Sequence, residues 1–490
     1  MIAKRLSAEL LPDPTRVVAQ LFLPGEELHL AQSRASQIVS RVLGLAEADA
    51  AELSEGLLRD FSARHHDYRG LLERHASIVA GRVKQNQPLS EERNLLLGAS
   101  FTAEYASEGA ALCNPSAVLH PDQSGLDQDQ VRLAVSLRGI GEGHISSIGF
   151  CSAVVGPGPS WVFEPRGRPV STATVAAARW RIVHLRSVLA GQGHLNELCE
   201  AVLRALPDEF DSADLEQALA GTHYDLLTRA GSSDTVELLR KTVASAYTAS
   251  FPKDSELSQR VLVPSAQEES NGMEDARFTR FIHEDGRAEY RATYTAYDGQ
   301  LIAPRLLVSP DLRVFHAHRL AGRAARNKGM ALFPRLVGGK HLALCRSDGE
   351  STSLAVSADG YVWGEPVSLQ APSAAWEMLQ VGNCGPPIET DRGWLVLTHG
   401  VGPMRVYAIG AMLLDLANPT IVRGQLALPL LSPARDGIDG YVPNVVYSCG
   451  GFLHAGRVWI PFGADDARIG VAYVELADLL DELDELSTDS

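Results

Sequence analysis

The residues best suited to chemistry lie in segment 271–281, Asn-Gly-Met-Glu-Asp-Ala-Arg-Phe-Thr-Arg-Phe. It places two adjacent carboxylates, Glu274 and Asp275, and the guanidinium of Arg277 at the entrance of an expected strand. Like charges held close together raise the pKa of one of them, so one carboxyl can act as an acid while its neighbour orients a substrate. Taken alone, such a segment is more often a solvated turn that contains an ion pair.

Polar residues that could contact a ligand flank other expected strands. Asn327 and Lys328 precede the apolar run 329–334 and suit an anion or a sugar, although a surface loop is the commoner context. His399 ends an apolar strand, where a histidine is more often part of the core than a ligand. Glu350 and Glu377 are each, singly, more typical of solvated positions. Their joint appearance is what indicates a site.

The composition excludes several classes of protein. The 490 residues are 45% hydrophobic and 21% charged, as in an ordinary globular protein. A net charge of -16 disfavours nucleic acid and anionic membrane surfaces as partners. The six cysteines show no C-x-x-C pattern, so we expect neither a disulfide framework nor a metal or other cofactor. Because the sequence has no signal-like segment and no apolar run long enough for a membrane span, we expect a cytoplasmic protein.

Apolar spacing divides the chain into helical and strand-rich parts. Residues 1–105 are predicted to be a mostly helical N-terminal region, and 166–255 a helical insertion. Short apolar runs broken by Gly, Asp and Pro fill 106–165 and return at nearly regular spacing over 256–476. Residues 477–490 read as an acidic helix and tail. Many short strands with such turns indicate a β-sandwich or a propeller.

The strand-rich parts resemble glycoside hydrolase family 130, the inverting β-mannoside phosphorylases and mannosidases. The resemblance rests on short motifs, each weak, that follow one another in the family's order. They are Asn114-Pro-Ser, Val135-Ser-Leu-Arg138, Gly272-Met-Glu-Asp-Ala-Arg277, Thr293-Tyr-Thr-Ala-Tyr-Asp-Gly299, Asn327-Lys-Gly-Met-Ala-Leu-Phe-Pro334, Gly385-Pro-Pro-Ile388, Thr398-His-Gly-Val401, Ile409-Gly-Ala-Met-Leu-Leu-Asp-Leu416, Tyr441-Val-Pro-Asn-Val-Val446 and Gly463-Ala-Asp-Asp-Ala-Arg-Ile-Gly-Val471.

The resemblance implies a mainly β fold, a five-bladed β-propeller, with the helical parts packed outside it. It also implies that Asp275 is the general acid, which in the family's phosphorylases protonates the glycosidic oxygen through the 3-hydroxyl of the mannose. Ala276 stands where the family usually has Pro, a conformational difference that leaves the carboxylate usable. The residues implied to bind the sugar are Asn114, Arg138, Glu274, Arg277, Tyr297, Asp298 and Asp466.

The sequence gives mixed evidence on whether phosphate or water attacks the anomeric carbon. Phosphate requires cationic groups, whereas water requires a carboxylate base with room for the water beside the sugar. Lys328, Arg346 and His399 match positions where family phosphorylases carry cationic or donor groups, and Asn327 accompanies them. Cys345, however, stands where a phosphorylase typically has His, and the loss of this donor weakens phosphate binding.

On this balance we expect an exo-β-mannosidase, with Glu350 or Glu377 as base and Asp275 as acid. β-1,2-linked manno-oligosaccharides are one candidate substrate, and these residues do not decide between a 1,2 and a 1,4 linkage. The alternative is a β-mannoside phosphorylase that uses inorganic phosphate as co-substrate and releases α-mannose 1-phosphate. A third alternative is a non-catalytic carbohydrate-binding propeller. In each case the expected partner is a β-mannoside oligosaccharide, and homo-oligomerisation stays open.

Overall fold

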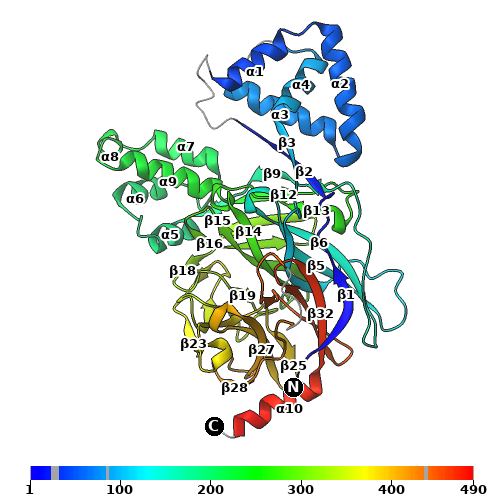
Figure 1. Ribbon diagram of the computed structural model, residues 1–490. Coiled ribbons are helices and arrows are strands. Elements are labelled where there is room, and N and C mark those ends of the chain that lie inside the picture. Colours follow the sequence, from blue (N-terminus) through cyan, green and yellow to red (C-terminus); the bar gives the residue numbers. More distant parts are fainter. Residues whose placement is uncertain (1, 24–32, 84–87, 435–439, 489–490) are drawn as a thin grey trace. The chain divides into compact units, whose positions relative to one another are not determined.

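The computed structural model describes residues 2–23, 33–83, 88–434 and 440–488 and divides into two compact units (Figure 1). The larger unit consists of Met1–Pro12, Ala110–Arg166 and Ala173–Ser490. The smaller unit consists of Asp13–Gly109 and Gly167–Thr172. Each unit has a hydrophobic core of its own.

The smaller unit is mainly helical. Its elements are β2 (Val17–Leu21), α1 (Arg34–Leu43), α2 (Glu47–Phe61), α3 (Tyr68–Arg82), α4 (Glu91–Ser100), β3 (Thr102–Ala106) and the short β8 (Ser171–Thr172). Strands β2 and β3 pair antiparallel. Side-chain oxygens of Ser33, Asp67 and Ser90 accept backbone N–H groups at the starts of α1, α3 and α4. The core is formed by apolar residues of all four helices.

The larger unit is mainly β, as expected, and its strands form successive groups. The first group is β4 (Ala111–Leu119), β5 (Val131–Ile140), β6 (Ser146–Val155), β7 (Trp161–Phe163) and β13 (Arg260–Leu262); the second is β14 (Gly272–Ile282), β15 (Ala288–Tyr297), β16 (Ile302–Ser309) and β17 (Val314–Arg319), extended by β12 (Tyr247–Ser250) and β9 (Thr174–Ala177). A parallel pairing of Gly272 with Ser146 joins these two groups into one sheet.

Three further groups follow along the chain. The third is β18 (Ala321–Gly322), β19 (Ala331–Leu332), β20 (His341–Cys345), β21 (Thr352–Ser357), β22 (Val362–Trp363) and β23 (Val367–Gln370); the fourth is β24 (Gln380–Asn383), β25 (Ile388–Thr390), β26 (Gly393–Val401), β27 (Tyr407–Leu414) and β28 (Val422–Gln425); the fifth is β29 (Val446–Tyr447), β30 (Phe452–His454), β31 (Arg457–Ala464), β32 (Arg468–Glu475) and β1 (Lys4–Leu10).

Neighbouring groups pack face to face, so strands that lie between two groups are buried on both faces. Strand β26 is buried along its whole length because its two faces enter different clusters. Trp394 and Val396 pack with the third group, and Leu395 and Leu397 pack with the fifth. Three more apolar clusters join the first group to the second, the second to the third and the fifth to the first.

The first residues of the chain form a strand of the larger unit and not part of a helical region. Strand β1 pairs antiparallel with β32, from Lys4 opposite Tyr473 to Leu10 opposite Ile469. Leu6, Ala8 and Leu10 face the core while the residues between them are exposed. This alternation has the period of a strand, and the prediction for 1–105 overlooked it.

The predicted helical insertion contains helices and sheet strands. Its helices are α5 (Ile182–Gly191), α6 (Glu197–Ala205), α7 (Ser212–Ala220), α8 (Tyr224–Leu227) and α9 (Ser232–Ala244), with the antiparallel pair β10 (Trp180–Arg181) and β11 (Glu209–Phe210). Before and after them, β9 and β12 extend the second sheet group, and residues 167–172 belong to the smaller unit. The helices share one apolar core. The boundaries 166 and 255 are therefore too wide for the helical part.

Helix α10 (Leu476–Thr488) follows β32 directly, and residues 489–490 of the predicted tail lie outside the described residues. Leu479, Leu480 and Leu483 of α10 are buried with strands of the fourth and fifth groups. Gly424 of β28 approaches so closely that an added Cβ would lie 2.0 Å from the Leu483 carbonyl oxygen. Within the described ranges, no helix is long and apolar enough to cross a membrane.

Replacing Leu483 by Ala should lower the free energy of unfolding by about 2–5 kcal/mol, because a fully buried side chain leaves a cavity between α10 and the sheet. Chemical denaturation of the wild type and the variant measures this loss. The exposed Asp478→Asn substitution in the same helix is the control and should change it by less than about 0.5 kcal/mol. Equal effects of the two substitutions would contradict the packing described for α10.

Candidate functional site

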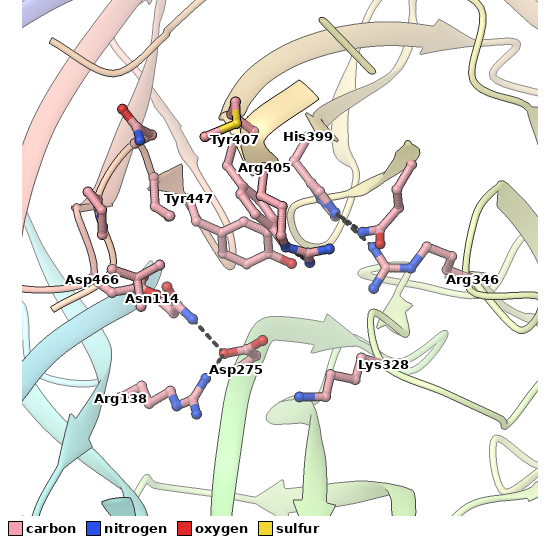
Figure 2. Close-up of a pocket in the computed structure, with 16 residues that line it drawn as sticks. Asn114, Arg138, Asp275, Lys328, Arg346, His399, Arg405, Tyr407, Tyr447 and Asp466 are labelled. Carbon is pink, nitrogen blue, oxygen red and sulfur yellow. Dashed lines mark hydrogen bonds and ion pairs between the residues drawn. The ribbon is translucent and has the colours of Figure 1, made fainter. Parts of the chain in front are cut away.

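A pocket of about 730 Å³ is lined by residues that come from all five strand groups (Figure 2). Each group supplies at least one residue to its wall. The lining residues are Asn114, Arg138, Asp275, Lys328, Arg346, Gln380, His399, Met404, Arg405, Tyr407, Val442, Pro443, Asn444, Val445, Tyr447 and Asp466. Polar and charged side chains predominate in this wall, which suits a hydroxyl-rich or anionic ligand.

Strands β4 and β14 are bulged where they reach the pocket. The pairing of β4 shifts register between Cys113 and Ser116, and that of β14 shifts between Glu274 and Arg277. At the bulges Asn114 and Asp275 have φ angles of 51° and 56°, a left-handed conformation that costs a non-glycine residue about 1–3 kcal/mol. The bulges bring the two side chains together, and Asn114 Nδ2 donates a hydrogen bond of 2.6 Å to Asp275 Oδ1.

Cations surround the carboxylate of Asp275. Arg138 Nη1 lies 3.2 Å from Asp275 Oδ1. Burial by itself raises the pKa of Asp275, but the charges of Arg138, Arg277 and Lys328 and the hydrogen bond from Asn114 together lower it well below its usual range. Asp275 is therefore ionised at neutral pH in this arrangement. The expected general acid must gain its proton through a further change in the site.

Asp466 is the second carboxylate of the pocket, and its environment acts in the opposite direction. It lies in the turn between β31 and β32, with a φ of 47°. Burial raises the pKa of Asp466 to about 6, with Arg138 opposing and Asp275 adding to the shift. The pKa values of the two carboxylates are therefore shifted in opposite directions, as those of acid and base groups in active sites often are.

Glu274 lies beside Asp275 but does not line the pocket. Its Oε1 accepts a hydrogen bond of 2.8 Å from Arg138 Nη2, and its Oε2 accepts one from Lys328 Nζ. Arg138 and Lys328, two of the cations that line the pocket, are thus held by one buried carboxylate. The resemblance implied that Glu274 binds the sugar. In the structure Glu274 does not line the pocket, so its position does not support that role.

Arg277 also lies behind the pocket wall. Its guanidinium donates to the carbonyl oxygens of Cys384 at 2.9 Å and Asp275 at 3.0 Å, and to the hydroxyl of Tyr447 at 2.8 Å. These bonds join the second, fourth and fifth strand groups and fix the carbonyl of the left-handed Asp275. All three nitrogen atoms of Arg277 make these bonds and the residue does not line the pocket, so its position does not support the expectation that it binds substrate.

Donor groups gather on the other side of the pocket. Figure 2 shows Arg346 and His399 across the pocket from Asn114 and Asp466. Arg346 Nη1 donates to His399 Nε2 at 2.8 Å, and Arg405 Nη2 donates to the Tyr407 hydroxyl at 2.8 Å. Burial, then the charge of Arg346, lowers the pKa of His399 well below its usual value, so the imidazole is neutral and accepts this bond.

The two expected base residues lie outside the pocket. Glu350 is exposed, and its backbone N–H and carbonyl bond to Asp348 and Val381. Glu377 is buried, but its carboxylate accepts from the backbone N–H groups of Ser373 and Ala374 and caps its own helical turn. Neither residue lines the pocket, so the structure does not support the prediction that either one activates water there. For Glu377 the reason is local, because its carboxylate is held by the backbone of its own turn.

Three predicted sugar ligands also lie outside the pocket wall. The Tyr297 hydroxyl donates to the Gly299 carbonyl, and Asp298 accepts from backbone N–H groups of its own turn. Asn327 is exposed and donates to the Ser347 carbonyl at 3.2 Å, although Lys328 next to it lines the pocket. The motifs containing these residues shape the loops around the site.

Sequence analysis missed several lining residues, including Gln380, Arg405, Tyr407, Asn444 and Tyr447. Arg405 and Tyr407 follow the Thr398–Val401 motif across one turn, and Asn444 lies inside a motif that was quoted without a role. Their closeness to these motifs could have identified Arg405, Tyr407 and Asn444 as candidate site residues. Gln380 lies in none of the quoted motifs. In the described part of the chain, no group of three or more His, Cys, Asp or Glu side chains is arranged to hold a metal ion.

Known proteins similar to this chain include several named as mannoside phosphorylases. The family model for glycoside hydrolase family 130, described as beta-1,4-mannooligosaccharide phosphorylase, matches residues 242–485. A beta-1,2-mannobiose phosphorylase of Thermoanaerobacter sp. (strain X514) is 34% identical over 219 residues, which cover 44% of this chain and 70% of that protein. A 1,2-beta-oligomannan phosphorylase of the same organism is 36% identical over 156 residues, covering 31% of this chain and 52% of that protein.

A solved structure also resembles the chain. It is the beta-1,2-mannobiose phosphorylase from Listeria innocua in complex with beta-1,2-mannobiose, with 20% identity and a TM-score of 0.43. The match covers 77% of this chain and 92% of that one.

Asp466 should make the stability of the protein fall as the pH rises from 4 to 7. The native state binds its proton more tightly than the unfolded state, so this contribution is full below pH 3.8 and is lost as the pH rises through about 6. At about 1.36 kcal/mol per pKa unit the loss is at most about 3 kcal/mol. Asp466→Asn mimics the protonated form, so the variant should gain stability relative to the wild type over this range.

Chemical denaturation of both proteins at matched pH values measures the difference. A difference that stays constant from pH 4 to pH 7 would contradict the raised pKa of Asp466.

Proposed function

The chain belongs to glycoside hydrolase family 130, and we propose that it is an inverting β-mannoside phosphorylase. Family membership makes it an enzyme that cleaves glycosidic bonds, by phosphorolysis or by hydrolysis. The proposal replaces the hydrolase that the sequence favoured. Both curated relatives described above are named as phosphorylases, which supports this choice.

One observation carries the choice between phosphate and water: the composition of the pocket wall. Lys328, Arg346 and Arg405 are cationic, and the neighbouring His399 and Gln380 add hydrogen-bonding groups. Among the described lining residues, the only carboxylates are Asp275 and Asp466. Figure 2 shows Asp466 across the pocket from Arg346, and Asp275 is already bonded to Asn114 and Arg138. Such a wall binds an anionic nucleophile but offers no base to a water molecule there.

The proposed reaction exchanges one bond at the anomeric carbon for another. A phosphate oxygen attacks this carbon on the face opposite the leaving group and forms the α-linked sugar phosphate. The bond to the leaving oxygen breaks, and that oxygen receives the proton of Asp275, directly or through a sugar hydroxyl. The unused acceptor Oδ1 of Asn114, buried and without a partner, supports a sugar hydroxyl at this place.

For the substrate we propose a β-1,2-linked manno-oligosaccharide, with α-mannose 1-phosphate as product. The linkage rests on the names of the relatives, which act on beta-1,2-mannobiose and 1,2-beta-oligomannan. The family model carries the name of a β-1,4 activity, so a β-1,4-linked substrate is the comparison to include.

We also propose that the five strand groups are the blades of a five-bladed propeller with the pocket at its axis. The face-to-face packing of successive groups, and of the fifth against the first, supports this arrangement. Strand β1 then completes the last blade with residues from the start of the chain.

Turnover of β-1,2-mannobiose should require inorganic phosphate and yield one α-mannose 1-phosphate for each bond cleaved. Replacing Arg346 by Met should raise the KM for phosphate by about 10- to 100-fold, because a partly buried charge-assisted contact is lost. The exposed Arg323→Met is the matched control and should leave this KM unchanged. Chromatography of products with and without phosphate measures the outcome, and phosphate-independent release of mannose would overturn the proposal.

Replacing Asp275 by Asn should lower kcat on β-1,2-mannobiose by about 100-fold or more, since the leaving oxygen loses its proton donor. An aryl β-mannoside with a good leaving group needs less protonation and should recover much of the rate. Asp298→Asn, which changes a carboxylate outside the pocket, is the control. Near-normal kcat of Asp275→Asn on the disaccharide would end the assignment.

A further inference from the structure

Glu274 holds two cations that come from different strand groups. Arg138 belongs to β5 of the first group, and Lys328 precedes β19 of the third, while Glu274 lies on β14 of the second. Each carboxylate oxygen accepts from one of them. The Glu274 side chain is only 9% exposed, so the carboxylate that holds the two cations is shielded from solvent.

The same two cations act on Asp275. Arg138 contacts its carboxylate directly, and the charge of Lys328 lowers its pKa. Further groups surround Asp275 from every neighbouring element: Asn114 and Cys113 on β4, Arg277 on β14, Arg346 after β20, His399 on β26, Tyr447 on β29, Cys449 after it and Asp466 between β31 and β32. Glu274 is the carboxylate next to Asp275 in the chain and the one bonded to both cations.

We propose that Glu274 is a positioning residue, which fixes Arg138 and Lys328 around Asp275 for catalysis and thereby weakens phosphate binding. The inference rests on the proposed function, because it assigns Lys328 to both the acid and the phosphate. It differs from the sequence expectation that Glu274 binds the sugar.

The cost to phosphate binding follows from charge. Lys328 has three N–H donors and can contact Glu274 and phosphate together, but Glu274 neutralises part of the field that attracts the anion. Removing the charge while keeping the shape, as in Glu274→Gln, should therefore tighten phosphate binding. Glu274 and the phosphate would lie several ångströms apart in a partly shielded site, so the affinity for phosphate should rise by about three- to tenfold in Glu274→Gln.

The benefit to catalysis follows from position and from the field at Asp275. Without Glu274, Lys328 loses its anchor, and Arg138 keeps its hydrogen bonds to Ser146 and Asp275. Loss of the neighbouring negative charge also lowers the pKa of Asp275 further, so the protonated acid becomes rarer. Glu274→Gln should therefore lower kcat by about tenfold or more and move the alkaline limb of the kcat profile to lower pH.

The experiment measures phosphate binding by titration calorimetry, and kcat for β-1,2-mannobiose against pH, in the wild type and three variants. Glu274→Gln should bind phosphate more tightly and turn over more slowly. Glu274→Asp keeps the charge but shortens the reach, so kcat should fall without tighter phosphate binding. Glu389→Gln, in an exposed ion pair with Arg335 outside the pocket, is the control and should match the wild type.

A merely structural role predicts a different result, namely weaker phosphate binding and lower kcat with an unmoved pH profile. That result in a folded Glu274→Gln protein would overturn the inference, as would unchanged phosphate affinity. If the wild type itself turns over without phosphate, the proposed function fails first. The two failures are thus distinguishable, because the first requires a phosphate-dependent wild type.

Discussion

The compensation of one buried carboxylate organises the centre of this protein. Asp275 is 7% exposed, and an ionised group so far from water is tolerated only with opposite charges and hydrogen bonds around it. Arg138, Lys328 and Asn114 provide them from strand groups that are distant in the sequence. The site therefore forms only when the strand groups pack against one another. Burial of the apolar clusters between the groups stabilises that packing.

Backbone strain is concentrated at the same place. Asn114, Asp275, Asn444 and Asp466 all have positive φ angles, and all four line the pocket. A regular strand would point successive side chains to opposite faces of a sheet. The bulges and tight turns redirect these side chains toward the pocket instead, and the packing of the surrounding strands holds the strained conformations in place.

The sequence predicted the residue types at the centre better than their immediate partners. Motif order brought together Asn114, Arg138, Asp275, Lys328 and Asp466, which the structure places in one pocket. Glu350 and Glu377 were misplaced because closeness to a strand end does not determine the direction of a side chain. For Glu377 that direction is set by Ser373 and Ala374, whose N–H groups it caps. Strand β1 was missed because its pairing partner lies at the other end of the sequence.

Charge links the proposed phosphate site to the proposed acid. The cations that would neutralise phosphate, Lys328 and Arg346, are among the groups whose fields reach Asp275. A phosphate anion beside them would cancel part of their charge, and the pKa of Asp275 would rise from its depressed value. The acid would then become able to hold a proton only when the nucleophile is present. This coupling explains how a carboxylate so strongly held in its ionised form can still serve as a proton donor in phosphorolysis.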